Sequence, residues 1–229
     1  MKVAVIGSGY VGLVTSLGFA KKNIKVTNID IDLDKVQKIK IKKPDIFEPG
    51  LKSILSSQLN KNYFITEKYS ECLKSDSIFI AVNTPHKNNG IDLSYLISAC
   101  KKIKNLILKN KVKKKIIIVI KSTVVPGTLE FKIKPIFKNL KNIFIANNPE
   151  FLREGSAIKD FLEPDRIIIG SNEKYALQYL KKVYSKFNSK IIFVGSTEAE
   201  LCKYFSNIIL SNLIAFSNEF SDVCEKFDD

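Results

Sequence analysis

The 229-residue sequence predicts an α/β protein with a doubly wound, mainly parallel sheet. Apolar, β-branched runs alternate with amphipathic stretches along the whole chain, as successive βαβ units require. Several runs are apolar throughout, such as residues 116–120, and these suit strands that are buried on both faces. The first run, residues 2–6, leads directly into a glycine turn and a helix-like stretch. These three observations predict one sheet with helices on both faces.

The predicted strands are short runs rich in Val, Ile and Phe, which favour extended backbone. They lie at residues 2–6, 25–29, 62–66, 77–82, 115–121 and 143–147, and two shorter runs at 167–170 and 190–194 would extend the sheet. Helical stretches have apolar residues three and four positions apart. They lie near residues 11–22, 33–42, 50–59, 69–74, 94–109, 127–138 and 173–187. We expect residues 1–195 to form one domain.

The last part of the chain, residues 196–229, is helical in pattern with little interruption. Its apolar residues at three- and four-residue spacings are Leu201, Tyr204, Phe205, Ile208, Ile209, Leu213, Phe216 and Phe220. An apolar helix face needs a partner that covers it. We therefore expect a long connecting helix followed by another domain or subunit.

Composition restricts the classes of function. The chain has no apolar run of the roughly 18 residues that a membrane span needs and no signal sequence at its start, so we expect a cytoplasmic protein with no membrane partner. The net charge of +14 raises the question of nucleic acid, but the lysines are spread over most helices without a basic, aromatic-rich motif. We expect no nucleic-acid partner, and a positive surface that attracts anionic nucleotides. Four scattered cysteines and one histidine predict no metal site.

The glycine turn has the form expected of a dinucleotide site. Gly7 permits the tight turn, Gly9 lets the backbone approach a pyrophosphate, and Gly12 lets helix and strand pack closely. The helix N-terminus would offer free N–H groups to the phosphates. Asp30, eighteen residues beyond Gly12, ends the next apolar run. Its carboxylate would accept a ribose hydroxyl and repel a 2′-phosphate, which predicts NAD rather than NADP. The alternative is a glycine turn in an α/β domain that binds no nucleotide.

Three further polar turns follow predicted strands, at residues 83–85, 121–127 and 147–155. In a doubly wound sheet ligands bind beyond the carboxyl ends of the strands, so these turns would meet at one edge. Each turn taken alone is also explained by turn chemistry or helix capping. Three such turns at the same edge of the sheet favour a ligand-binding site.

Together these motifs resemble the UDP-glucose/GDP-mannose dehydrogenase family, which comprises nucleotide-sugar dehydrogenases. The resemblance rests on Gly-Tyr-Val-Gly at 9–12, Asp-Ile-Asp at 30–32, Glu-Pro-Gly-Leu at 48–51, Asn-Thr-Pro at 83–85, Lys-Ser-Thr at 121–123, Asn-Pro-Glu-Phe-Leu-Arg-Glu at 148–154 and Pro-Asp-Arg-Ile at 164–167. It implies a Rossmann NAD-binding domain. It also implies oxidation of a sugar C6 alcohol to a carboxylate in two NAD-dependent steps, through a thioester on a cysteine. Within this resemblance, residues 163–170 are more similar to UDP-glucose dehydrogenases than to GDP-mannose dehydrogenases. The implied product is therefore UDP-glucuronate.

The resemblance also implies roles for single residues. The adenosine half of NAD would be held by Gly7, Gly9, Val11, Gly12, Asp30 and Lys35, and the rest by Thr84, Thr123 and Glu154. The wall against the UDP-sugar would be Glu150, Phe151, Leu152, Arg153 and Glu154. Glu150 would transfer protons with Thr123 and a water. Lys203 and Asn207, four apart on the long helix, would stabilise the oxyanions at C6.

These roles are chemically reasonable apart from the resemblance. A hydride leaves an alcohol only as its proton is removed, and a carboxylate can serve as the base. A buried ammonium beside an amide stabilises alkoxide charge. The alternatives are that Glu150 and Glu154 are helix-start acids and that Lys203 is a solvated surface lysine.

The sequence departs from the family pattern in one respect. The family's nucleophilic cysteine lies in a glycine-rich segment downstream of the long helix, and neither Cys202 nor Cys224 has glycine-rich surroundings. Without a thiol, the aldehyde intermediate cannot form a thiohemiacetal. We therefore expect an N-terminal part of such an enzyme, lacking the C-terminal UDP-binding domain, that binds NAD without completing the oxidation. Family members dimerise through the long helix, so we also expect a homodimer of the full-length protein.

Overall fold

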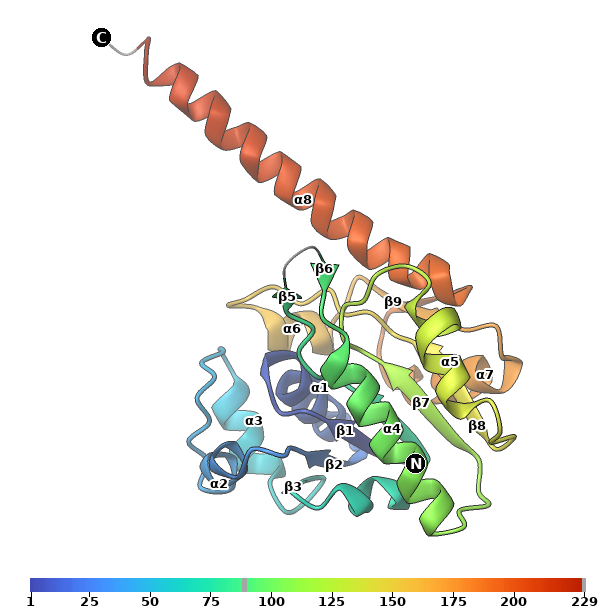
Figure 1. Cartoon of the computed structure of the whole chain (residues 1–229). Coiled ribbons are helices and arrows are strands. Elements are labelled where there is room, and N and C mark those ends of the chain that lie inside the picture. The colour runs from blue at the N-terminus through green and yellow to red at the C-terminus, as the bar shows by residue number, and fades with distance from the viewer. Residues whose placement is uncertain (88–89, 228–229) are drawn as a thin grey trace.

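A computed structural model describes residues 1–87 and 90–227 and shows an eight-stranded sheet between two layers of helices (Figure 1). The strands are β1 (Lys2–Ile6), β2 (Lys25–Ile29), β3 (Tyr63–Thr66), β4 (Ser77–Ile80), β7 (Ile116–Ile120), β8 (Ile143–Asn147), β9 (Arg166–Gly170) and β10 (Lys190–Val194). They are ordered β10-β9-β8-β7-β4-β1-β2-β3. The six from β3 to β8 are parallel and follow the order 3-2-1-4-5-6 of a doubly wound dinucleotide-binding sheet.

The two remaining strands, β9 and β10, continue the sheet beyond β8 and run antiparallel to the other six. β9 meets β8 antiparallel at Gly170 and Asn147, and β10 runs parallel to β9. A separate two-stranded pairing joins β5 (His86–Lys87) and β6 (Gly90–Ile91). The fold class predicted from the sequence, a doubly wound and mainly parallel sheet followed by a long helix, is confirmed.

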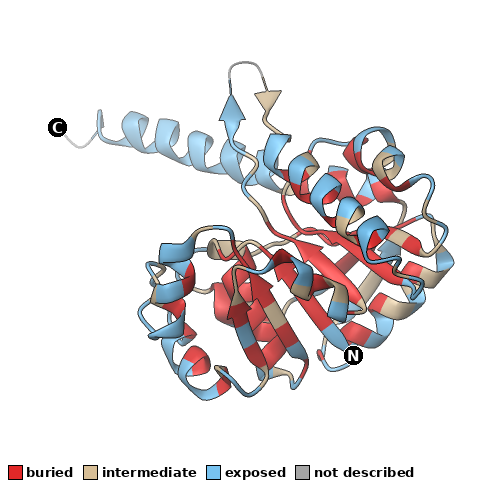
Figure 2. Ribbon diagram, turned by 60° about the horizontal axis from the view of Figure 1, so that its bottom comes forward, coloured by how far each residue is buried: buried red, intermediate tan, exposed pale blue. Residues whose placement is uncertain are grey.

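Helices and helical turns connect the strands. They are α1 (Tyr10–Lys21), α2 (Leu33–Lys40), α3 (Leu51–Gln58), the 3₁₀ helix η1 (Tyr69–Lys74), α4 (Ser94–Lys109), the π turn η2 (Leu129–Ile133), α5 (Lys134–Phe137), α6 (Ala157–Leu162), α7 (Lys174–Tyr184) and α8 (Ser196–Cys224). Side chains along β1 alternate between the two layers: Val3 and Val5 pack with α1, whereas Ala4 and Ile6 face the layer of η1 and α4. The sheet is therefore buried on both faces (Figure 2).

The predicted bounds hold with small differences. The strands predicted at 2–6, 25–29, 143–147 and 190–194 have those bounds, while the predictions at 77–82 and 115–121 are one or two residues too long. The helix predicted at 127–138 is instead a π turn followed by α5, because Pro135 lacks the N–H that an α-helix would use there. α6, with six residues, was not predicted, because it is too short to show a period.

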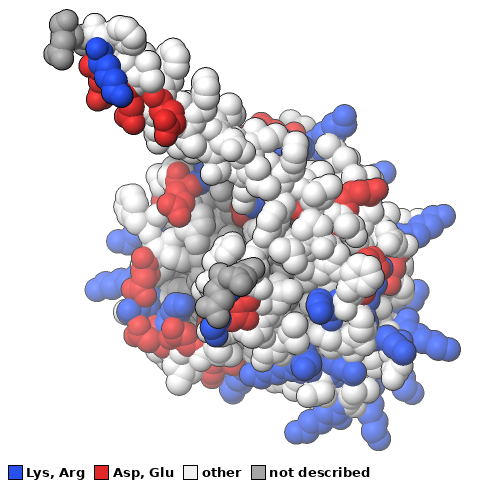
Figure 3. Space-filling model, turned by 45° about the horizontal axis from the view of Figure 1, so that its top comes forward, with Lys and Arg blue, Asp and Glu red and all other residues white. Residues whose placement is uncertain are grey.

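Helix α8 leaves the body of the domain and extends away from it (Figure 1). Its buried residues are all near its start: Ser196, Ala199, Glu200 and Lys203. From Phe205 onward the predicted apolar positions are exposed, for example Phe205 at 61% and Phe216 at 70%. Among the helices described, none combines the length and the apolar character of a membrane span. Lys and Arg side chains stand at many separate places around the body on the face seen in Figure 3.

The layer of α1 depends on a close contact at Gly18. A Cβ atom at Gly18 would lie 2.0 Å from the ring of Phe161 in α6. That ring packs edge-on against Phe19 and Phe187, so it has little room to move.

We predict that Gly18→Ala lowers the free energy of unfolding by about 1–3 kcal/mol, because overpacking strains a filled core. Urea unfolding followed by circular dichroism measures the change. Gly90→Ala is the control, since a Cβ there has nothing within 4 Å. Equal stability of the Gly18→Ala variant and the native chain would contradict the packing described.

Candidate functional site

The turn from β1 to α1 forms the centre of the site. Gly7 has φ +97°, and a Cβ there would lie 2.5 Å from the carbonyl oxygen of Ala81. A Cβ at Gly12 would lie 2.2 Å from the carbonyl oxygen of Gly7. α1 begins after Gly9, and no side chain caps the N–H groups of its first turn. Free N–H groups and the positive end of the helix dipole suit a phosphate.

Asp30 fastens this turn to the end of β2. One of its carboxylate oxygens accepts from both the backbone N–H and the hydroxyl of Ser8, each at 2.6 Å. The other accepts from the backbone N–H of Asp32 at 3.0 Å. An ionised carboxylate offers about four acceptor positions, so one remains for a ribose hydroxyl. The predicted role of Asp30 is therefore compatible with the hydrogen bonds that it already makes.

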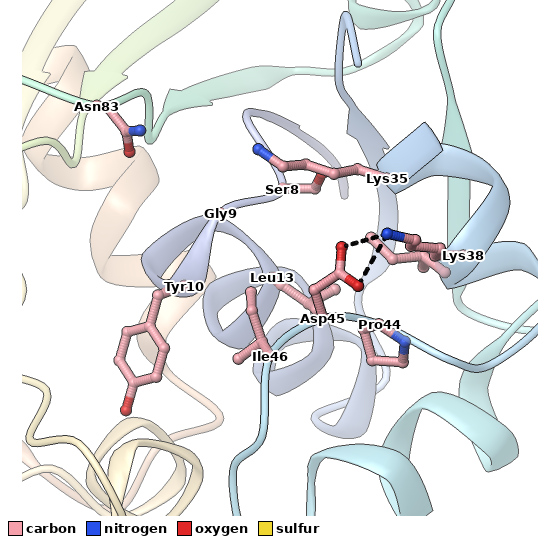
Figure 4. A pocket seen from close by; sticks show the side chains of 11 residues that line it. Ser8, Gly9, Tyr10, Leu13, Lys35, Lys38, Pro44, Asp45, Ile46 and Asn83 are labelled. Atoms are coloured by element: carbon pink, nitrogen blue, oxygen red, sulfur yellow. Dashed lines mark hydrogen bonds and ion pairs between the residues drawn. The ribbon is translucent and has the colours of Figure 1, made fainter. Parts of the chain in front are cut away.

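Two adjoining pockets lie on either side of Gly9. The first, of ≈ 240 Å³, is lined by Ser8, Gly9, Tyr10, Leu13, Lys35, Lys38, Ile39, Pro44, Asp45, Ile46 and Asn83. Figure 4 shows Lys35 and the Lys38–Asp45 ion pair together in this pocket, with Asn83 farther along. The second, of ≈ 170 Å³, is lined by Gly9, Tyr10, Val11, Ala81, Val82, Asn83, Thr84, Lys121, Ser122, Thr123 and Glu150. The pockets share Gly9, Tyr10 and Asn83 and are therefore adjacent, as the two halves of an extended ligand would require.

The polar turns predicted to meet at one edge of the sheet do so in the second pocket. The hydroxyl of Thr84 donates to the backbone oxygen of Thr123 at 2.7 Å. The hydroxyl of Ser122 donates to the backbone oxygen of Val82 at 2.6 Å. These bonds fix the turns after β4 and β7 to each other, and Glu150 comes from the turn after β8.

A buried ion pair stands beside this pocket. The Lys203 ammonium lies 2.9 Å from one carboxylate oxygen of Glu150, and both side chains are about nine-tenths buried, with 9% and 12% exposed. The other oxygen of Glu150 accepts from the backbone N–H of Leu152 at 2.8 Å. Lys203 is therefore not a solvated surface lysine. A carboxylate and an ammonium in this arrangement can move protons and stabilise an anion.

Lys203 reaches the site because α8 is fastened to the turn after β7. The buried carboxylate of Glu200 accepts from the backbone N–H groups of Gly127, at 2.6 Å, and Leu129, at 2.8 Å. Burial raises the pKa of Glu200, and the two N–H donors oppose that rise.

Lys121 is a buried residue at the second pocket to which the sequence pattern assigned no individual role. It is 4% exposed and lines the second pocket. Burial lowers its pKa to about 8, while the charge of Glu150 raises the pKa and that of Lys203 lowers it further. The available signal was a lysine directly after a continuously apolar strand, where a solvated position is not expected.

Glu48 connects the dinucleotide turn to the loop of residues 150–155. Its carboxylate is buried and accepts from the hydroxyl of Tyr10 at 2.7 Å, from the N–H of Gly155 at 3.1 Å and from the N–H of Ala157 at 2.6 Å. Burial raises the pKa of Tyr10, and the bond to Glu48 raises it further, so the hydroxyl stays a donor. Tyr10 lines both pockets, so Glu48 holds the loop against the wall of the site.

Other predicted site residues lie at the edge or outside. Arg153 pairs with Asp160 at 2.7 Å and its side chain is 75% exposed. Glu154 is exposed and lines neither pocket, and Asn207 is exposed one turn beyond Lys203 on α8. The centre of the Phe151 ring lies 5.5 Å from the Lys203 ammonium and 5.0 Å from the Arg166 guanidinium. The roles that the resemblance implies for these four residues stay predictions.

Comparison with known proteins agrees with this geometry. Residues 1–188 match the model of the NAD binding domain of the UDP-glucose/GDP-mannose dehydrogenase family. The chain is 40% identical to UDP-glucose 6-dehydrogenase of Rickettsia prowazekii, over 99% of this chain and 52% of that protein.

Two solved structures have similar folds. A UDP-glucose dehydrogenase from Pyrobaculum islandicum superposes with a TM-score of 0.90 at 36% identity, covering 96% of this chain and 52% of that one. A GDP-mannose dehydrogenase from Pseudomonas aeruginosa superposes with a TM-score of 0.90 at 31% identity, with the same coverage. The chain thus spans about half the length of each.

We predict that Asp30→Ala weakens NAD binding about tenfold, the effect of one lost hydrogen bond to a charged group. It should also reduce the preference for NAD over NADP, because the repulsion of a 2′-phosphate disappears. Calorimetric titration with both cofactors measures the ratio. Ser8→Ala removes one bond to Asp30 but keeps the carboxylate, so it should leave the preference unchanged. An unaltered NAD/NADP ratio in Asp30→Ala would refute the assignment.

Loss of the Glu48 carboxylate should destabilise the loop. Glu48→Ala leaves one hydroxyl and two N–H donors without their acceptor, and we predict a loss of at least about 2 kcal/mol in unfolding free energy. Tyr10→Phe removes only one of the three donors and should destabilise the chain less. Thermal unfolding of the two variants, measured side by side, gives the order. The reverse order would contradict the network.

Proposed function

The chain belongs to the UDP-glucose/GDP-mannose dehydrogenase family, and we propose that it binds NAD across the two pockets and oxidises a nucleotide sugar there. The sugar nucleotide we propose is UDP-glucose, and the full reaction is its two-step oxidation to UDP-glucuronate. The observation that carries this proposal is the buried Glu150–Lys203 pair, 2.9 Å apart, beside the pocket that Thr123 also lines.

The residues present fit NAD. The close approach at Gly7 and Gly12 leaves no room for a Cβ, and the N-terminus of α1, which no side chain caps, would face the pyrophosphate of the bound cofactor. Gly9 belongs to the same turn, and Val11 belongs to the first turn of α1. Asp30 and Lys35 would hold the adenosine half, and Thr84 and Thr123 would line the other half. Bound NAD supplies the hydride acceptor.

The chain's own groups would move the protons and stabilise the charge. As the C6 alcohol is oxidised, its proton would pass through a water held by Thr123 to the Glu150 carboxylate. The ammonium of Lys203 would stabilise the oxygen on which negative charge develops. Asn207 would need to approach from its exposed place on α8 to donate its amide. The loop of residues 150–154, with Phe151, Leu152 and Arg153, would form the wall against the sugar nucleotide.

The choice of UDP-glucose rests on sequence. The stretch at 163–170 leans toward UDP-glucose, and the Rickettsia relative has that specificity by name. GDP-mannose is the alternative, since a dehydrogenase for that sugar superposes equally well.

A second candidate function is an NAD-binding module without turnover. None of the cysteines lines either pocket: Cys72 and Cys100 are buried elsewhere, and Cys202 and Cys224 are exposed on α8. Without a thiol in the site, the second oxidation step lacks its covalent intermediate. We therefore propose that residues 1–229 alone bind NAD and the sugar nucleotide without completing the oxidation.

The domain organisation is also a proposal. Residues 1–195 would be the NAD-binding domain, and α8 would begin the helix through which two full-length subunits pair. The exposed apolar residues of α8, such as Leu213 and Phe216, support this arrangement.

We predict that NAD binds to the chain, that UDP-glucose binds the NAD-loaded chain more tightly than GDP-mannose does, and that no sustained NADH absorbance follows.

Glu150→Gln should keep NAD affinity within about twofold and weaken UDP-glucose binding, because the carboxylate lies outside the adenosine half. Calorimetry and absorbance at the NADH band measure these results. Steady production of two NADH per UDP-glucose would refute the incomplete reaction, tighter GDP-mannose binding would refute the sugar, and absence of NAD binding would refute the function itself.

A further inference from the structure

Lys121 is a buried, charged residue that has no role in the proposed proton transfer or charge stabilisation. It lies at the end of β7 under the second pocket, and 4% of its surface is exposed. Its ammonium donates to the side-chain oxygen of Asn148 at 3.1 Å and to the backbone oxygen at 3.3 Å. Both acceptors are neutral, and none of the ion pairs found among the residues that the structure describes includes Lys121.

The charged and titratable groups around Lys121 come from three elements. Glu150 belongs to the turn after β8, Lys203 to α8 and Tyr184 to α7. Glu150 is already paired with Lys203 at 2.9 Å. The hydroxyl of Tyr184 donates to the side-chain oxygen of Asn148, and burial raises its pKa, so it stays neutral. Two ammonium groups against one carboxylate leave a net charge of +1 beside the pocket.

The two redox states of the cofactor differ in charge at one place. Oxidised NAD carries a positive nicotinamide ring, whereas the ring of NADH is neutral, and the adenosine diphosphate part is common to both. Lys35, which the resemblance assigns to the adenosine half, lines the first pocket, so the adenosine half would lie there and the nicotinamide half in the second pocket. The second pocket is where the net positive charge lies.

We propose that Lys121 sets the redox preference of the cofactor site, its buried ammonium weakening the binding of oxidised NAD relative to NADH. This inference rests on the proposed function, because it takes NAD as the ligand. A buried charge acts on the ring through a medium of low dielectric constant and is poorly screened by salt.

The relative affinity of the site for NAD and NADH should depend on pH through the charge of Lys121. Burial lowers the pKa of Lys121 to about 8, so the group is an ammonium near pH 7 and mostly a neutral amine near pH 9. Raising the pH through this range removes the repulsion of the cationic ring. The ratio of the Kd of NAD to the Kd of NADH should therefore fall as the pH rises.

The test measures this ratio by calorimetry with the whole chain, near pH 7 and near pH 9. At pH 7 Lys121→Met should lower the ratio on the order of tenfold, the effect of a unit charge across roughly 10 Å at an effective dielectric constant of about 20. The ratio in this variant should no longer change with pH. Damage to the turn would change both Kd values together, so the ratio isolates the charge.

The matched control is Lys115→Met. Lys115 is an exposed lysine just before β7, at the opposite end of the strand that precedes Lys121, so its loss should leave the ratio unchanged. If Lys121→Met does not fold, the pH dependence of the native chain decides alone. A ratio that stays constant with pH in the native chain, or a shift as large in Lys115→Met as in Lys121→Met, overturns the proposal. Failure of the native chain to bind either cofactor would instead overturn the proposed function.

Discussion

The site depends on how closely α1 approaches the pair of strands β1 and β4. At Gly7 and Gly12 the backbone of the turn lies so near its neighbours that a Cβ would come within 2.5 and 2.2 Å of carbonyl oxygens. This contact places the uncapped start of α1 at the point where the strand order reverses, between β1 and β4. Both pockets share Gly9 for that reason, and the hydrogen bonds from Ser8 to Asp30 keep the turn in position.

The charged groups of the second pocket are buried at a cost that the surrounding hydrogen bonds offset. An ammonium or carboxylate removed from water needs a partner or several polar contacts. Glu150 and Lys203 have each other, and Lys121 has the two oxygens of Asn148. The carboxylates of Glu48 and Glu200, which anchor the loops, accept hydrogen bonds from backbone N–H groups and, at Glu48, from the Tyr10 hydroxyl. Glu48 binds the loop that contains Gly155, and Glu200 binds the turn that contains Gly127, so each carboxylate joins two segments that are distant in the sequence.

Much of the fold follows from local pattern. Continuous apolar runs such as residues 116–120 can be buried only between two layers, and this predicts both the strand and the parallel sheet. The pattern is weaker where an element is short. Six residues of α6 do not show a helical period, and the π turn before α5 follows from one missing N–H at Pro135.

The sequence by itself determined the doubly wound sheet, the dinucleotide turn and the edge at which the polar turns meet, because each follows from residues that are neighbours along the chain. Only the tertiary structure decided which side chains share a pocket. Lys203 reaches Glu150 across 53 residues because Glu200 fastens α8 to the turn after β7. Lys121 is charged yet buried, and Arg153 turns to Asp160 rather than to a pocket. Burial and pairing between distant segments are not encoded in spacing, since they depend on how the segments pack.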